Sequence, residues 1–322
     1  MKPAALLFSA FVLTLACSPT FAEPQALITV NPNNFAPGQN ISNATIGAQL
    51  RALYVVPNPQ LPGFNMPREN SGVFSQSVQA ACTVFPGLNI RCSPVGSNVL
   101  GYSPVSTPSA SPIFWGEANR AVMCLQGDCG SPDDLQTIPA LRINFDRPTN
   151  YVTALAPWFL GDGGVIYTFA FDSAGELVDL CYGFPGQDIG VPGCTTTLYS
   201  GTPSAGWVRY TMSHPNADIS FVVIGGAAND RPIAQVQFNS PVSLQLDGLI
   251  KEVTVVAPHE GLAIKLLIAR VYYAVRDFRA TCAILNGVDH DITARSGKRI
   301  SALAASQLLA TTRAVEDALN CQ

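Results

Sequence analysis

The spacing of apolar residues changes once along this chain, near residues 256 to 261, and the change separates two kinds of fold. Before it, short β-type runs alternate apolar with polar residues and end at Gly, Pro, Asn or Asp, which is typical of antiparallel sandwiches and barrels. After it, apolar residues recur at the helical period. We therefore expect a mainly β protein: an antiparallel jelly-roll or β-sandwich domain over residues 23–255, followed by a small module of two or three α-helices over residues 256–322.

The clearest strand predictions lie in the second half of the β region. Residues 141–145 alternate and should end at 146–148, because Pro148 cannot donate to a sheet ladder. In residues 165–171, the odd-numbered side chains should share one buried face. Residues 31–139 are richer in Pro, Ser, Asn and Gly, and we interpret them as early strands with long loops. Further strands are expected over residues 151–159, 207–212, 219–224, 235–238 and 243–249.

The C-terminal module shows two apolar stripes with helical spacing. Gly297 should end the first helical stretch, which bends near Asp277, and Ser301 should cap the next one. The second stripe consists of Leu308, Val315 and Leu319. The first stripe consists of Ile264, Ile268, Val271, Val275, Phe278, Cys282 and Leu285.

The start of the chain has the order of a secretory signal. Lys2 precedes an apolar stretch over residues 4–16 and a small-residue segment ending at Ala22, so we expect a signal peptide over residues 1–22. Lipidation at Cys17 is disfavoured, because Thr14 stands where an aliphatic residue is usual. No stretch reaches the roughly 20 apolar residues that span a bilayer. The predicted location is extracellular or on the cell surface, with the periplasm as the alternative.

Removal of residues 1–22 would leave eight cysteines, an even number that indicates disulfides in an exported protein. They fall into sequence-local couples, and the simplest pairing joins neighbours. Cys-x-x-Cys is absent from the sequence, which disfavours zinc sites and thioredoxin-type chemistry. The predicted pairs are Cys82 with Cys92, Cys124 with Cys129, Cys181 with Cys194, and Cys282 with Cys321.

The sequence offers little sign of catalysis or of nucleic-acid binding. Residues 23–254 hold nine Lys and Arg against sixteen Asp and Glu, and an acidic body argues against nucleic acid. His214, His259 and His290 lack the spacing of metal or catalytic pairs. No catalytic residue is therefore predicted, although a pair of carboxylates brought together by the fold would not show in the sequence.

Aromatic and acidic residues supply the candidates for ligand binding. Four aromatics lie near predicted strand ends and loops, where a ring could stack on a sugar, although a tryptophan is more often part of the core. These are Trp115, Trp158, Tyr182 and Trp207. No cofactor is predicted. A structural calcium ion could bind Asp128, Asp133 and Asp134 around Cys129, but an ordinary solvated turn explains these residues as well.

Several short motifs resemble known families of bacterial exported proteins. The sandwich region resembles galactose-binding-like jelly rolls, including many with sorting tails of the PEP-CTERM type, but this chain has no Pro-Glu-Pro tail. The resemblance rests on residues 37–41, 45–47, 73–75, 143–148, 171–178 and 244–249. The end of the chain resembles the FIMAH-type helical module through residues 282–288, 292–300 and 308–309. Both resemblances imply secretion and an accessory role, without a chemistry.

Three functions remain open on this evidence. The first is a secreted, non-catalytic protein that binds a glycan or surface polymer through sandwich loops. The second is a structural or adhesive component of the envelope or matrix with protein partners, and the third is an unrecognised hydrolase. Exposed coplanar aromatics in a groove would favour the first, a large apolar patch the second, and facing carboxylates in a cleft the third.

Overall fold

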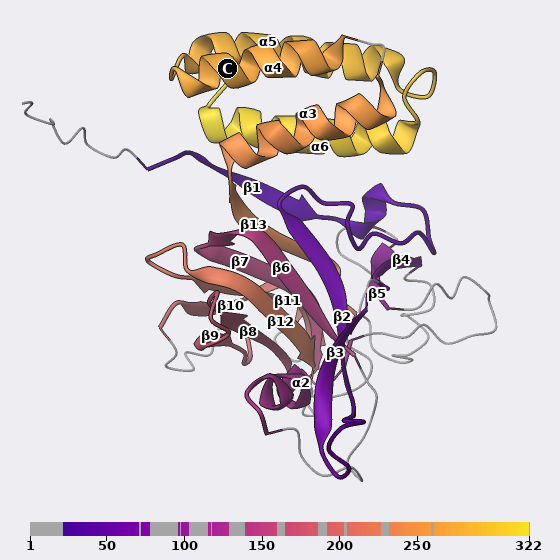
Figure 1. Ribbon diagram of the computed structural model, residues 1–322, viewed down its shortest axis with the longest axis vertical. Helices are drawn as coiled ribbons and strands as arrows, with labels where there is room; N and C mark the ends of the chain where they lie inside the picture. The colour runs from indigo at the N-terminus through magenta and orange to yellow at the C-terminus, as the bar shows by residue number, and fades with distance from the viewer. Residues whose placement is uncertain are drawn as a thin grey trace, which may run out of the picture.

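The protein is an antiparallel β-sandwich joined to a bundle of α-helices, as seen in a computed structural model (Figure 1). The structure describes residues 22–70, 72–77, 96, 98–102, 115–116, 118–128, 139–159, 165–185, 192–202, 205–226, 232–258 and 261–321. The mainly β class with a C-terminal helical module, predicted from the sequence, is confirmed.

One sheet has five strands in the order β1-β13-β7-β11-β10, all antiparallel. Its strands are β1 (Gln25–Val30), β13 (Gln235–Pro241), β7 (Tyr151–Phe159), β11 (Ala205–Ser213) and β10 (Cys194–Thr202). The edge strand β1 pairs with β13, so the first and last strands of the sandwich lie side by side and carry the helices at one end (Figure 1).

The second sheet has six strands in the order β3-β2-β6-β12-β8-β9. They are β3 (Asn65–Asn70), β2 (Ala48–Pro57), β6 (Ala140–Thr149), β12 (Ile219–Gly226), β8 (Ile166–Phe171) and β9 (Leu177–Cys181). The predicted end of β6 at residues 146–148 is wrong, since the strand continues to Thr149. The extension tolerates Pro148 because the pairing with β2 stops at Phe145, and the register with β12 shifts between Phe221 and Ile219.

Smaller elements complete the sandwich. The short strands β4 (Phe74–Ser77) and β5 (Asn98–Gly101) pair with each other, and a 3-10 turn, η1, spans Pro32–Asn34. A helix absent from the sequence prediction, α2 (Ala118–Leu125), lies on the outer face of the six-stranded sheet.

Helix α2 explains why β8 is buried on both faces. Ile166 and Ala170 point into the core between the sheets, whereas Phe169 and Phe171 join a second apolar cluster with α2. The predicted common face of the odd-numbered residues is confirmed for these two phenylalanines, and the even-numbered face is buried as well.

Four helices follow the last strand directly. They are α3 (Val242–Val256), α4 (Leu262–Ala274), α5 (Phe278–Arg295) and α6 (Ala302–Leu319). Helices α3 and α6 lie next to the strands, and α4 with α5 forms the layer farther from them (Figure 1). The predicted strand over residues 243–249 is wrong, because Val242, Leu246, Leu249 and Val253 form the buried face of α3. The helical part thus begins at residue 242, not 256.

The predicted stripe along α4 is also wrong. Ile264, Ile268, Val271 and Val275 are exposed, and α4 instead buries Leu262, Leu266, Ala269 and Tyr273. Further along, the prediction holds: α4 ends at Ala274, and Asp277 caps α5 by accepting from the Ala280 N–H at 3.0 Å. Ser301 caps α6 in the same way, and Leu308, Val315 and Leu319 are buried.

Bundle and sandwich share one apolar core. Buried residues from β1 through α6 form one continuous cluster. The buried Gln245 of α3 donates to Ser240 Oγ (2.8 Å) and to the Ile46 carbonyl (3.2 Å). Glu23 accepts from the Ser243 N–H (3.0 Å) and from the Tyr273 hydroxyl (3.2 Å), so the start of the described chain is attached to both α3 and α4.

Two of the predicted disulfides are confirmed. Cys181 and Cys194 have a Cα–Cα distance of 5.0 Å, and Cys282 and Cys321 one of 5.3 Å. Cys124 is disulfide-bonded. Its predicted partner Cys129 and the predicted pair Cys82 and Cys92 lie outside the described residues, as does most of the predicted signal peptide. None of the helices that the structure describes is both long and apolar enough to span a membrane.

Candidate functional site

The three tryptophans predicted as sugar platforms lie in the core. Trp115, Trp158 and Trp207 are only 0, 1 and 3 % exposed. Trp115 packs against Tyr102, with ring centroids 5.5 Å apart, and Trp158 packs against Phe184 at 4.5 Å. The prediction is wrong for these three residues, because their rings are buried in the core, those of Trp115 and Trp158 against neighbouring aromatic side chains.

Tyr182 is half-buried and stacks on Tyr167, with ring centroids 5.4 Å apart and planes inclined by 22°. One face of its ring therefore packs on a side chain of the same molecule. Of the predicted calcium ligands, Asp128 is exposed just after α2, whereas Asp133 and Asp134 lie outside the described residues. Within the described ranges, His, Cys, Asp and Glu do not gather in groups of three or more that could hold a metal ion.

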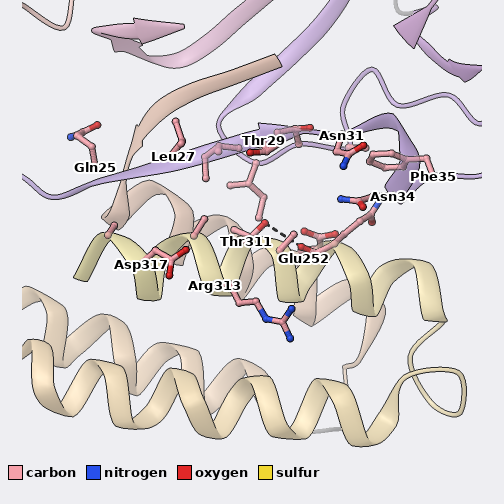
Figure 2. A pocket seen from close by; sticks show the side chains of 18 residues that line it. Gln25, Leu27, Thr29, Asn31, Asn34, Phe35, Glu252, Thr311, Arg313 and Asp317 are labelled. Atoms are coloured by element: carbon pink, nitrogen blue, oxygen red, sulfur yellow. Dashed lines mark hydrogen bonds between the residues drawn. The ribbon is translucent and has the colours of Figure 1, made fainter. Parts of the chain in front are cut away.

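A polar cleft of about 610 Å³ lies where the sandwich meets the bundle. Strand β1 and the segment after it form one wall, and α3 and α6 form the other (Figure 2). Polar and apolar groups share the lining, and its amides and hydroxyls include those of Gln25, Thr29, Asn31, Asn34, Gln307 and Thr311. Groups of this kind bind the hydroxyls of polar ligands.

Two carboxylates line this cleft but do not face each other. Figure 2 shows Glu252 toward the end that carries Asn31 and Asn34, and Asp317 toward the end that carries Gln25. Burial raises the pKa of Glu252. Arg313 turns away from β1 toward α5, where its Nε lies 3.3 Å from Asp289 Oδ2. The cleft thus lacks the facing pair of carboxylates that would favour a glycosidase.

The outer face of α4 carries the largest side chains that the bundle leaves uncovered. Six apolar residues, five on α4 and one directly after its last residue, follow each other at steps of three and one and are between 39 and 69 % exposed. We call them the α4 stripe: Ile264, Leu267, Ile268, Val271, Tyr272 and Val275. Because the opposite side of α4 is buried, this helix is apolar on both sides, which is the pattern of a helix that is covered all round.

The charged residues of α4 flank the stripe and are neutralised within the chain. Lys265 Nζ lies 2.8 Å from Asp291 Oδ2 of α5, and Arg270 Nε lies 2.8 Å from Asp247 Oδ1 of α3. Lys265 and its neighbour Arg295 lower the pKa of Asp291. The α4 stripe itself therefore presents an uncharged surface between one ion pair with α5 and one with α3.

Four residues of the stripe were predicted from their helical spacing, but as a core face. The helical period alone cannot tell which of two apolar faces is buried. A usable signal was present in the composition of α4, since Lys265 and Arg270 are its only charged residues and more apolar positions remain than one buried face needs.

No protein-family model matches this chain, and no curated protein matches it. The resemblances to galactose-binding-like jelly rolls and to the FIMAH-type module therefore stay predictions.

Proposed function

We propose that this chain is an exported, non-catalytic protein that works as a structural or adhesive component, docking a protein partner on the α4 stripe. The observation that carries the proposal is the stripe itself: six large apolar side chains, all exposed, on a helix that is apolar on both sides. Contiguous apolar patches of more than a few hundred Å² are rare on monomers and mark interaction sites.

The disulfides support the export part of the proposal. Cys181–Cys194 and Cys282–Cys321 have bonding geometry, and such bonds persist in oxidising compartments outside the cytosol. The predicted signal peptide over residues 1–22 has the same implication. Helix α4 has 13 residues, well short of the roughly 20 that cross a bilayer, so its apolar outer face calls for a partner beside it.

The proposal is tested by photo-cross-linking in the cells that make the protein. A benzophenone amino acid replaces Leu267 in the stripe or, as the control, Val255 of α3. Val255 is 76 % exposed but lies beside residues 43–49, on the sandwich side of the bundle. We expect protein cross-links from position 267 and few from position 255. Equal cross-linking from both positions, or none from 267, would contradict protein docking at α4.

A second candidate function is saccharide binding in the polar cleft, favoured by its amide and hydroxyl lining. This cleft takes the place of the predicted sugar site on loop aromatics, because the three tryptophans of that site are buried. The mature chain should then bind a glycan array, and Asn34→Ala combined with Gln307→Ala should remove that binding. Unchanged binding in this double variant would place a saccharide site elsewhere.

A further inference from the structure

We infer that the partner on the α4 stripe is a second copy of this chain, bound antiparallel across a two-fold axis between Ile268 and Val271. This inference rests on the proposed function, which requires a protein on this face, and it identifies that protein. Three features of the stripe favour a second copy: its spacing, its lack of charge and its area.

The spacing of the stripe reads the same in both directions. From Ile264 to Val275 the steps between its residues are three, one, three, one and three. An antiparallel copy therefore presents the same pattern in reverse. Ile264 would pack against Val275 of the other copy, Leu267 against Tyr272, and Ile268 against Val271. In a two-fold contact residue i meets j and j meets i, so a stripe with this symmetry is complementary to itself.

The absence of charge matters most near a two-fold axis, where a side chain lies close to its own symmetry mate. A charged residue there would face a like charge, which destabilises the contact. The stripe contains only Ile, Leu, Val and Tyr. The flanking Lys265 and Arg270 are already paired with Asp291 and Asp247, so the rim also carries little unpaired charge.

The area suits a reversible dimer. From the exposed fractions of its six side chains, the stripe offers roughly 600 Å² per copy, or about 1,200 Å² in a dimer, at the lower limit for specific interfaces. Helices α4 and α5 form the layer farthest from the strands, so two copies could meet through α4 without contact between their sandwiches (Figure 1). We expect dissociation in the micromolar range.

Sedimentation equilibrium of the oxidised chain from Glu23 onward tests the inference. The mass should double with rising concentration, and Val271→Asp should weaken association at least about 30-fold, because the contact would bury an unpaired charge. Val255→Asp places the same charge on a somewhat more exposed valine outside the stripe, 76 % against 63 %, and should leave association unchanged. A monomer at all concentrations would overturn the inference, and so would equal effects of the two substitutions.

Cysteine cross-linking tests the antiparallel arrangement. A mixture of Ile268→Cys and Val271→Cys chains should form a disulfide between the two variants under mild oxidation, whereas each variant alone should react poorly. Efficient reaction of each variant with itself, and little in the mixture, would indicate parallel helices and overturn the arrangement.

Two further outcomes separate this inference from the proposed function. If the chain is monomeric but Val271→Asp still removes the cross-links from position 267, the partner is a different protein; self-association fails and protein docking stands. If the chain is monomeric and instead binds vesicles of phosphatidylethanolamine and phosphatidylglycerol through the stripe, both are overturned in favour of a lipid surface.

Discussion

The tryptophans of the sandwich and the apolar residues on the outer face of α4 differ in how far the rest of the chain covers them. Trp115, Trp158 and Trp207 of the sandwich are at most 3 % exposed, whereas the residues of the α4 stripe are at least 39 % exposed. In the sandwich, the other sheet covers one face of the six-stranded sheet and α2 covers the other. In the bundle, α3 and α5 pack against the inner side of α4, and among the described residues no further element covers its outer side. A large apolar side chain is therefore buried only where another element packs over it. We propose that a partner packs over the outer face of α4.

The largest expected effect lies in the sandwich. Trp158→Ala should lower the free energy of unfolding by about 3 to 5 kcal/mol, because it removes a fully buried ring and leaves a cavity. Urea denaturation measures this loss. A change below about 1 kcal/mol would mean that the ring is solvent-exposed, and the contrast between the two regions would fail.

Each region contains a disulfide, which stabilises the fold by restricting the unfolded chain. Cys282–Cys321 spans 39 residues in the bundle and Cys181–Cys194 spans 13 in the sandwich, so the bundle bond closes the longer loop. Replacing both cysteines by Ala should cost about 4 kcal/mol in the bundle and about 3 kcal/mol in the sandwich, measured by denaturant unfolding. A clearly larger loss in the sandwich would contradict this loop-length argument.

A pH effect of intermediate size is expected in the bundle. Burial, and then the Asp289 carboxylate, raise the pKa of Glu316 from 4.5 to about 7, and burial raises that of Asp289. Because the folded state binds these protons more tightly, the contribution of the two groups to stability should be greatest below about pH 4.5 and fall as pH rises to about 7.

Glu316→Gln should remove the part of this fall that Glu316 causes, which we expect to be on the order of 1 kcal/mol since water screens part of the repulsion. Urea unfolding at about pH 5 and about pH 8 measures it. An equal pH dependence in Glu316→Gln and the parent chain would show that other groups cause it.

The smallest effect is expected on the α4 stripe. In the dilute monomer, Val271→Ala should change the free energy of unfolding by less than about 0.5 kcal/mol, because the side chain is 63 % exposed. Leu266→Ala, on the buried side of the same helix, should cost about 2 to 5 kcal/mol. Similar losses for the two substitutions would show that both sides of α4 are covered within one chain.

Features that depend on residues close together in the chain were predicted correctly from the sequence. Period-two runs, caps at Asp277 and Ser301, and the neighbour pairing of two disulfides follow from residues close together in the chain. Helix α3 was missed because residues 243–249 alternate over a short window, and its helical face emerges only when Val242 and Val253 are included.

The candidate site could not be predicted, because it depends on layering. Nothing local distinguishes the buried Leu266 from the exposed Leu267 in a helix that is apolar on both sides, or shows that Tyr102 covers Trp115. The cleft likewise forms from β1 and α6, which lie at opposite ends of the chain.

Hydroxyl-radical footprinting of Tyr272 tests most directly whether the α4 stripe is covered in the assembled protein. Tyr199 on β10, 44 % exposed, is the matched control for Tyr272, which is 39 % exposed in one chain. Our account predicts that labelling of Tyr272 falls several-fold as protein concentration rises through the micromolar range, while labelling of Tyr199 stays constant. Equal labelling of the two tyrosines at every concentration would contradict it.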